Sequence, residues 1–409
     1  MNKAPQKIAQ LISLTTAVAL SQSAFAQNSS AVSSSPQNST SETKKNEETI
    51  RRLEARIDEL EKNTEERLNF MADAVEAQVN DSHKSKVHFG GYGELHYSNL
   101  DVNGTDYREL DMARFVLFTG YDFNDHIRFV SELEVEHTLV SSGSRGAVEL
   151  EQAYIEIDLQ PNMHLKTGVI LMPIGITNET HEPPTFYGVK RPVVETSIIP
   201  TTWYSAGMSF NHQFDSGWSY DLMVSEGLKT DDPTATPGAD PFDLKAGKQK
   251  GSFSAAYDLA LTGRVAYRGI RGLEVAAYAQ QQPDLDQSAR NSYAEGATLL
   301  GCHVVYQLSD FTAKALYARW DLDGDAAKNA GKDVQAGGYV ELDWQPLKQW
   351  GAFVRQSAWS QMQDVDANQT DLGINYYPHP DVVFKGSYQL QNDDAGNSDG
   401  FYLGMGYQF

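Results

Sequence analysis

The sequence is short of three things: cysteine, positive charge and long apolar runs. Its single cysteine, Cys302, excludes an internal disulfide and any Cys-x-x-Cys zinc or redox site. Its net charge of −22 argues against nucleic-acid binding, which needs a basic surface. Residues 1–86 carry 11 Lys and Arg against 12 Asp and Glu, and residues 87–409 carry 22 against 43. The acidity therefore belongs to the second part of the chain.

Motifs of catalytic and metal-binding chemistry are also lacking. His181-Glu182 begins like the zinc motif H-E-x-x-H, but Thr185 stands where the second histidine should be. Residues 321–325 (DLDGD) resemble half of a calcium loop, whose twelfth position should be a glutamate and is Lys332. No G-x-S-x-G motif occurs. We therefore predict no enzyme activity, no catalytic residue, no metal site and no cofactor.

The first 26 residues have the three parts of a secretory signal peptide. Lys3 and Lys7 supply the positive start, residues 8–20 are mostly apolar, and residues 24–26 (AFA) form a small-x-small cleavage site. The apolar part is shorter than the about 20 residues that a membrane-spanning helix needs. We therefore predict that the protein is secreted and that residues 1–26 are removed.

Residues 27–80 divide into a linker and a helix. Residues 27–46 are rich in Ser, Asn and Gln without an apolar period, which indicates a disordered linker. Across residues 47–80 apolar residues recur at spacings of three and four, as in a coiled coil. These residues include Ile50, Leu53, Ile57, Leu60, Met71 and Val75. A helix this polar favours self-association, and the alternative is a lone solvated helix.

From residue 87 onward, segments of about ten residues alternate apolar and polar side chains, as in a transmembrane β-barrel. The clearest is residues 127–136 (IRFVSELEVE), where apolar residues share one face and charged residues the other. Sixteen such segments begin near residues 87, 108, 126, 148, 163, 200, 217, 253, 272, 294, 311, 333, 350, 368, 382 and 400. An even number of strands is typical of bacterial single-chain barrels.

The connections between these segments alternate between short turns and longer polar loops. The loops are expected at 99–107, 138–147, 173–199, 229–251, 283–292, 322–332, 361–367 and 392–399. This regularity distinguishes a barrel from a soluble sandwich, whose strands also alternate. Both termini then fall on the short-turn side, which is periplasmic in outer-membrane barrels. A barrel of 16 strands is too wide for side chains to fill, so it encloses an aqueous channel.

Four stretches resemble the family of phosphate-selective porins O and P and their relatives. They are GGYGELHYS from Gly90, MARFVLFTGYDFNDHIRFVSELEVEH from Met112, EQAYIEIDL from Glu151 and LKTGVILMPIG from Leu165. The terminal Phe409, two residues after Tyr407, is similar to the end of outer-membrane barrels generally. The resemblance covers about residues 87–409. It implies a trimer of 16-stranded barrels whose third surface loop, here 173–199, folds inward.

The sequence departs from that family in its basic residues. Phosphate-selective members line the pore with a ladder of arginines and a group of lysines, and this chain has no such density. The basic residues on the strand faces predicted to point into the lumen are scattered along the chain. They are Arg114, Arg128, Lys166, Arg264, Arg268, Lys314 and Lys385. The sequence alone therefore assigns neither a solute nor a sign of ion selectivity.

We predict an all-β protein: a 16-stranded antiparallel transmembrane β-barrel in residues 87–409, preceded by a short α-helical coiled coil. The protein is expected to be an outer-membrane porin with its coil in the periplasm. It would admit small hydrophilic solutes or ions by passive diffusion and contact outer-membrane lipids. The alternative function is a structural tether between the outer membrane and the cell wall through the coil.

The constriction is predicted to hold a transverse electric field between the barrel wall and the loop at 173–199. Basic wall residues would face acidic residues of the loop, and two basic residues also lie on that loop. The wall residues are Arg114, Arg128 and Lys166, and the loop residues are Glu179, Glu182 and Glu195, with Lys190 and Arg191. The alternative is that these charges pair with one another only to hold the loop in place.

We expect the protein to be a homotrimer. Isoleucine at the a positions and leucine at the d positions of residues 50–60 favours a two-stranded coil. A short coil joined to a barrel should nevertheless follow the larger interface between barrels. Cross-linking in mild detergent should give a trimer band. A clean dimer, or a monomer at every protein concentration, would contradict this prediction.

Overall fold

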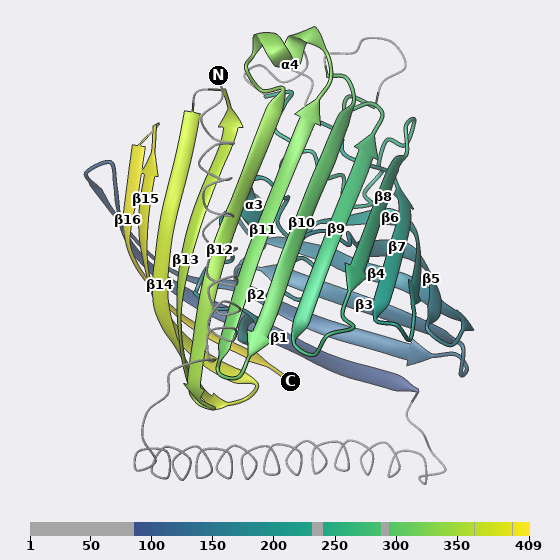
Figure 1. Ribbon diagram of the computed structural model, residues 1–409, viewed down its shortest axis with the longest axis horizontal. Helices are drawn as coiled ribbons and strands as arrows, with labels where there is room; N and C mark the ends of the chain where they lie inside the picture. Colours follow the sequence, from purple (N-terminus) through teal and green to yellow (C-terminus); the bar gives the residue numbers. More distant parts are fainter. Residues whose placement is uncertain (1–85, 231–239, 288–293, 364, 395) are drawn as a thin grey trace, which may run out of the picture. The chain divides into compact units, whose positions relative to one another are not determined.

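A computed structural model describes residues 86–230, 240–287, 294–363, 365–394 and 396–409. The signal peptide, the linker and the coiled-coil helix predicted in residues 1–80 lie outside these ranges. The described chain forms a closed barrel of 16 antiparallel strands, so the predicted fold class is confirmed for this part (Figure 1). Among the described residues, no helix has the length and apolar character to cross a membrane.

The strands follow one another around the barrel in chain order. They are β1 (Val87–Val102), β2 (Thr105–Asp122), β3 (Ile127–Glu136), β4 (Ala147–Gln160), β5 (Met163–Leu171), β6 (Tyr204–Gln213), β7 (Trp218–Ser225), β8 (Ala260–Tyr267), β9 (Leu273–Gln282), β10 (Ala297–Leu308), β11 (Phe311–Leu322), β12 (Val334–Leu347), β13 (Trp350–Met362), β14 (Val365–His379), β15 (Val382–Asp393) and β16 (Gly396–Gln408). In the described parts of the connections lie three short helices: η1 (Pro183–Thr185), α3 (Val194–Ser197) and α4 (Asp325–Asn329).

The barrel closes through the pairing of its first and last strands, β1 and β16. The terminal Phe409 extends this pairing, because it exchanges hydrogen bonds of 2.9 and 3.0 Å with the main chain of Gly91. Closure gives every strand a neighbouring strand on both sides. Lipid requires this, because it offers the main chain no hydrogen-bonding partner. The first strand and the terminal aromatic residue, which both resemble those of other outer-membrane barrels, are thus the two parts of the chain that pair to close the barrel.

The predicted alternation of side chains appears as two faces of one wall. On β3, Glu132 and Glu134 are 1% and 3% exposed and face the lumen, whereas the intervening Leu133 is 37% exposed on the outer face. Three aromatic pairs stand beside the short turns, with ring centroids 4.5–6.2 Å apart: Trp350–Tyr376, Trp218–Tyr267 and Phe311–Trp344. Such aromatic residues mark the membrane–water boundary of outer-membrane barrels.

Three of the predicted long loops are wrong. Residues 99–107 form the end of β1, the turn at Asn103 and Gly104, and the start of β2. Both turn residues have positive φ, 53° and 80°, which suits a two-residue hairpin. The segments 361–367 and 392–399 likewise belong mainly to strands, since two residues separate β13 from β14 and β15 from β16. Polar sequence marks the end of the lipid-facing band, but strand pairing continues beyond it.

The longest connections instead follow β5 and β7. Residues 172–203 join β5 to β6, and residues 226–259 join β7 to β8, so the eighth strand begins at Ala260 rather than near 253. Helix α3 of the first connection contacts β12 and β13, and Figure 1 shows it within the ring of strands. Residues 173–199 therefore fold into the lumen, as predicted.

An apolar core inside the barrel holds these two connections. It joins them to the inner face of β9–β13, around Ile198, Leu244 and Trp320. The ring centroids of Trp320 and Trp203 are 6.0 Å apart. The indole N–H of Trp320 donates a 3.1 Å hydrogen bond to the carbonyl of Ile198. One side of the lumen is therefore filled, and open space is left to the other side.

Replacing Trp320 by alanine should test this internal core. Trp320 is fully buried, so its loss should lower the free energy of unfolding by about 3–5 kcal/mol. Urea unfolding of the barrel in lipid vesicles would measure the change. Trp344→Ala is the matched control because Trp344 lies on the outer face, 47% exposed. An equal or smaller effect of Trp320→Ala would contradict the interpretation.

Candidate functional site

The connection at residues 172–203, called here the inward loop, is held by basic side chains of the barrel wall. Arg114 of β2 donates a 3.1 Å hydrogen bond to the main-chain carbonyl of His181. Arg355 of β13 donates to the carbonyl of Tyr187 at 2.9 Å. Lys385 of β15 donates to the carbonyls of residues 186 and 188, both at 2.9 Å. Hydrogen bonds from charged donors are among the strong ones, so these three residues anchor the loop.

Carboxylates compensate the two anchoring arginines. Arg114 lies 2.6 Å from Glu94, and Arg355 lies 2.5 Å from Glu341, with all four side chains buried. Removing one partner of a buried pair would leave an uncompensated charge, which is strongly destabilising. Lys385 lies 3.6 Å above the centre of the Phe186 ring. The anchors are thus built into the wall and are not free to bind solutes.

Small residues of β16 let the loop approach the wall closely. A Cβ atom at Gly406 would lie 2.2 Å from Cβ of Pro183 in the loop, closer than real atoms approach. A Cβ at Gly404 would lie 3.0 Å from a methyl group of Val189. Both glycines lie on the face of β16 that meets the loop. Their lack of side chains is what leaves room for the inward loop.

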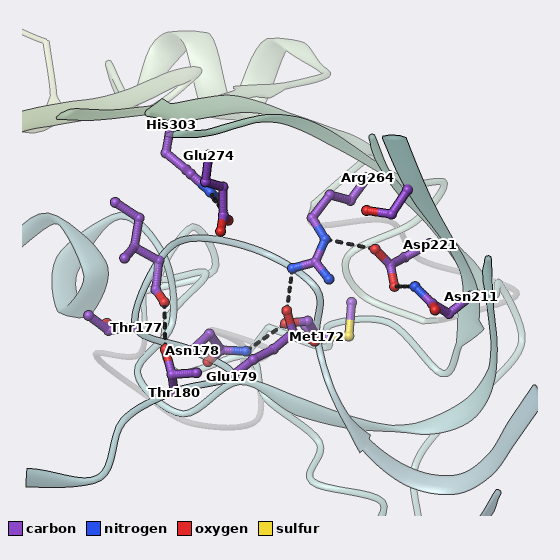
Figure 2. Close-up of polar contacts among 12 residues, drawn as sticks. Met172, Thr177, Asn178, Glu179, Thr180, Asn211, Asp221, Arg264, Glu274 and His303 are labelled. Atoms are coloured by element: carbon purple, nitrogen blue, oxygen red, sulfur yellow. Dashed lines mark hydrogen bonds and ion pairs between the residues drawn. The ribbon is translucent and has the colours of Figure 1, made fainter. Parts of the chain in front are cut away.

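The start of the inward loop reaches the opposite wall through an ion pair. Arg264 of β8 lies between Asp221 and Glu179, as Figure 2 shows. Its Nε is 2.8 Å from a carboxylate oxygen of Asp221, and its Nη1 contacts Glu179 of the loop. The loop is therefore tied to β8 by charge and to β2, β13 and β15 by its carbonyls.

Two buried polar residues shape the loop itself. The amide of Asn178 donates to the carbonyl of Met172 and accepts from the main-chain N–H of Trp203, so it ties the two ends of the loop together. A carboxylate oxygen of Glu195 accepts the N–H groups of residues 176 and 177, both at 2.8 Å. Its other oxygen accepts from Tyr339 of β12 at 2.7 Å. Glu195 thus supports the fold of the loop.

The loop borders two cavities in the lumen. The outer chamber, of about 530 Å³, is bounded by β1–β4, β14–β16 and loop residues 186–196. The inner chamber, of about 380 Å³, is bounded by β4–β8 and the start of the loop. Along β4, Glu149 and Glu151 line the outer chamber, and Tyr154 and Glu156 line the inner one. Since β4 runs from a long connection to a short turn, the chambers are stacked along the barrel.

Charges of opposite sign line different sides of the outer chamber. Besides the Glu94–Arg114 pair of β1 and β2, four carboxylates come from the wall strands β3 and β4, and four cations come from the two long connections. The carboxylates are Glu134, Glu136, Glu149 and Glu151, and the cations are Lys190, Arg191, Lys248 and Lys250. This arrangement can orient a solute that carries charge or a large dipole.

Comparison with known proteins agrees with this architecture. The family model for phosphate-selective porins O and P matches residues 89–399. The chain belongs to this family. As a porin it is an outer-membrane channel for passive diffusion. A similar sequence, 28% identical over 367 residues and covering 80% of both chains, is an uncharacterized protein of Aquifex aeolicus.

Solved porins have the same fold. An anion-selective porin from Comamonas acidovorans matches 79% of this porin and 99% of its own chain, with a TM-score of 0.57 and 13% identity. OmpF of Salmonella typhi, in complex with daunomycin, matches 79% and 97%, with a TM-score of 0.54 and 14% identity. The channel DcaP of Acinetobacter baumannii matches 79% and 97%, with a TM-score of 0.52 and 12% identity.

The basic wall residues named from the sequence of this porin lie at different depths. Arg114 lines the outer chamber and anchors the loop. Lys166 lines the inner chamber, 3.9 Å from Glu156. Arg128 lies one residue inside β3, beside a short turn, where it pairs with Glu156 and Asp158 and lines neither chamber. The three residues therefore do not form one ring.

The loop residues named from the sequence also separate. Lys190 and Arg191 line the outer chamber, and Glu179 lines the inner one. Glu182 is half-buried and lines neither chamber, and Glu195 is buried within the loop. The structure thus brings the loop's cations to the outer chamber and leaves one loop carboxylate, Glu179, on the inner one.

Glu151 is a lumen residue that the sequence alternation missed. Strict alternation along the strand would place Glu151 on the outer face with Ala153, two residues further on. A β-bulge in β4 turns it inward instead. The register shows the extra residue: Glu132 pairs with Gln152, and Leu133 pairs with Leu150. Two successive polar residues, Glu151 and Gln152, interrupt the alternation, and this interruption was the sign of a bulge in the sequence.

Replacing Gly406 by valine should disturb the seat of the inward loop. The new side chain would overlap Pro183, so overpacking should cost about 1–3 kcal/mol of stability. We also expect larger fluctuations of the open-channel current in planar bilayers, because the loop loses its fixed position. Gly386→Val is the control, since a Cβ there would meet its neighbours at ordinary distances of 3.7 Å or more. Unchanged stability and current noise in the Gly406 variant would refute the assignment.

Proposed function

We propose that this porin admits small hydrophilic solutes carrying an anionic group, and that it orients them in a transverse field across the outer chamber. The observation that carries the proposal is the separation of charge in that chamber. Wall strands β3 and β4 supply the negative side, and the two long connections supply the positive side. The anionic group would lie toward the connections.

Most of the positive side is not neutralised by carboxylates. Among the described residues, Lys190, Arg191 and Lys248 have no carboxylate within 4 Å, whereas Lys250 pairs with Glu149. Lys190 lies 3.0 Å from a ring nitrogen of His96, and Arg191 donates to the hydroxyl of Thr202 at 2.8 Å. Lys248 donates to the carbonyls of Thr201 and Thr202. None of these three charges is balanced by a neighbouring carboxylate, so each can attract an anionic group.

The polarity of the proposed field differs between the two chambers. In the inner chamber, Lys166, which was named from the sequence, and Arg264 face the loop carboxylate Glu179. Two wall carboxylates, Glu156 and Asp221, also line this chamber beside them. In the outer chamber the wall is acidic and the loops are basic. We therefore assign anion contact to Lys190 and Arg191 of the inward loop.

The expected size of the field is sufficient for selection. Two unit charges about 4 Å apart interact by about 1 kcal/mol in bulk water and by about 4 kcal/mol at the lower effective dielectric of a protein surface. A narrow, water-filled chamber lies between these limits. Rings and rows of charge in channels select ions by interactions of this size.

The trimer, expected from the resemblance to porins although the heptads favour two strands, is part of the same proposal. Support comes from membership of a porin family and from the fold shared with OmpT of Vibrio cholerae, which has been solved in a trimer form at 10% identity and a TM-score of 0.51.

Removing charges from the two sides should move ion selectivity in opposite directions. The double variant Lys190→Gln/Arg191→Gln should shift the zero-current potential in a KCl gradient toward cation preference. Glu134→Gln/Glu136→Gln should shift it toward anions. We expect the permeability ratio to change roughly threefold to tenfold, since these factors correspond to about 0.7–1.4 kcal/mol.

Matched charge changes outside the lumen serve as controls. Arg271→Gln and Asp215→Asn alter exposed residues of short turns and should leave the zero-current potential unchanged. If both lumen variants behave like these controls, the outer chamber is not the selectivity site, and the proposal fails.

The selectivity should depend on pH through Lys248. Burial, with the positive charge of Lys250 beside it, lowers the pKa of the Lys248 ammonium to about 8. The group is therefore charged below that pH and neutral above it, so anion preference should fall between pH 7 and pH 9. Lys248→Arg should remove this pH dependence and keep the preference, because arginine stays protonated. A wild-type selectivity that is flat over this range would contradict the prediction.

A further inference from the structure

Three metal-ligating side chains converge between the two chambers. They are Glu132 of β3, Glu151 of β4 and His181 of the inward loop, and one donor atom of each lies within 4.8 Å of the others. The side chains are 1%, 2% and 3% exposed. The β-bulge of β4 is what brings Glu151 to this place, and the anchoring of the loop by Arg114 brings His181.

Two of the three donor atoms of this cluster, one from His181 and one from Glu151, have no hydrogen-bond partner among the described residues. Nδ1 of His181 lies 2.9 Å from the carbonyl oxygen of Asn178, which can only accept, so Nδ1 carries the proton. Nε2 points toward the two carboxylates and makes no hydrogen bond among the described residues, so in the neutral imidazole it is the nitrogen free to bind a metal. Oε2 of Glu151 makes none either. Buried polar atoms without partners are rare and costly in native proteins.

We propose that Glu132, Glu151 and His181 bind one divalent first-row transition-metal ion, such as Zn²⁺, which fastens the inward loop to the barrel wall. Nε2 of His181 lies 3.5 Å from Oε1 of Glu132 and 3.6 Å from Oε2 of Glu151. Ligand atoms on a tetrahedral Zn²⁺, bonded at about 2.1 Å, are about 3.4 Å apart. The two separations are therefore those of neighbouring ligands on one ion.

The surroundings of the cluster match those of a metal site. Tyr92 and Gln152 donate to the two oxygens of Glu132, at 3.2 and 2.6 Å, and so orient that carboxylate. The carbonyl of Asn178 does the same for His181 through Nδ1. Such outer contacts are the usual support of metal ligands. A divalent cation would also balance the two carboxylates of the cluster.

The choice of donors selects the class of ion. Ca²⁺ takes six to eight oxygen ligands, and this buried cluster supplies two carboxylates and one imidazole. Imidazole together with carboxylate suits Zn²⁺ and its neighbours in the first transition row. Three protein donors leave a fourth position for water or another ligand.

A second cluster shows what a satisfied arrangement looks like. Glu156, Asp158 and His164 also bring three donor atoms within 4.8 Å of one another. There Arg128 pairs with both carboxylates, and Nδ1 of His164 lies 2.6 Å from Asp158. Because an arginine already balances those carboxylates, we assign no metal to it. It provides the matched control.

Metal binding to the full-length protein in detergent tests the proposal directly. Protein without a histidine tag, freed of metal by a chelator, is titrated with Co²⁺ and then with Zn²⁺. We expect one ion per chain, the visible absorption of tetrahedral Co²⁺, displacement of Co²⁺ by Zn²⁺, and a higher melting temperature with Zn²⁺. Glu151→Gln and His181→Gln should each weaken binding at least tenfold, whereas His164→Gln should leave it unchanged.

Heat-dependent gel mobility will show whether each variant forms the barrel. If His181→Gln does not fold, Glu151→Gln carries the test. Failure of the folded wild-type protein to bind Co²⁺ or Zn²⁺ would overturn the proposal, and His181 would then be an ion-pairing imidazolium. Binding that survives in both cluster variants, or that His164→Gln abolishes, would overturn it as well.

Discussion

The arrangement of the channel depends on one requirement: a loop that leaves the barrel wall and enters the lumen must find donors for its main-chain carbonyls. Inside the wall, the hydrogen bonds of the sheet meet this need for every strand. The inward loop has no such partner along residues 181–188, and Arg114, Arg355 and Lys385 supply the donors. Their charges are desolvated, which explains why buried carboxylates stand beside the two arginines.

This anchoring makes the pore asymmetric. An apolar core fills the lumen along β9–β13 and includes Trp203 and Trp320, so water and solutes are left with the opposite side. There the acidic strands β3 and β4 face the basic residues of the two long connections. The field of the outer chamber is therefore a consequence of where the loop is held, and the loop is held where the wall offers donors and glycines.

The same packing accounts for the buried cluster of Glu132, Glu151 and His181. The loop carries the imidazole to the wall, and a bulge turns one additional carboxylate toward it. A loop fixed by carbonyl contacts on β2, β13 and β15 still needs a contact on β3 and β4, where the two chambers meet. The cluster lies at that point.

The sequence by itself determined the barrel, because lipid and water impose a period of two on every strand and a short turn at every second connection. Through the resemblance to porins it also identified the inward loop, and the alternation of residues 127–136 placed the charged side chains, Glu132 and Glu134 among them, on one face of their strand. It overestimated the loops at 99–107, 361–367 and 392–399, because polarity does not distinguish a strand above the membrane from a loop.

Tertiary structure alone decided which lumen residues meet. Alternation along the strands places Arg114 and Arg128 on the same face of the wall. It does not give their depth in the barrel, which depends on strand register: Arg114 lies beside the loop and Arg128 beside a short turn. The bulge at Glu151 reverses parity locally. The partner of His181 could not be found from spacing, because Glu132 and Glu151 reach it through the closure of the sheet and the inward course of the loop, both of which are long-range contacts.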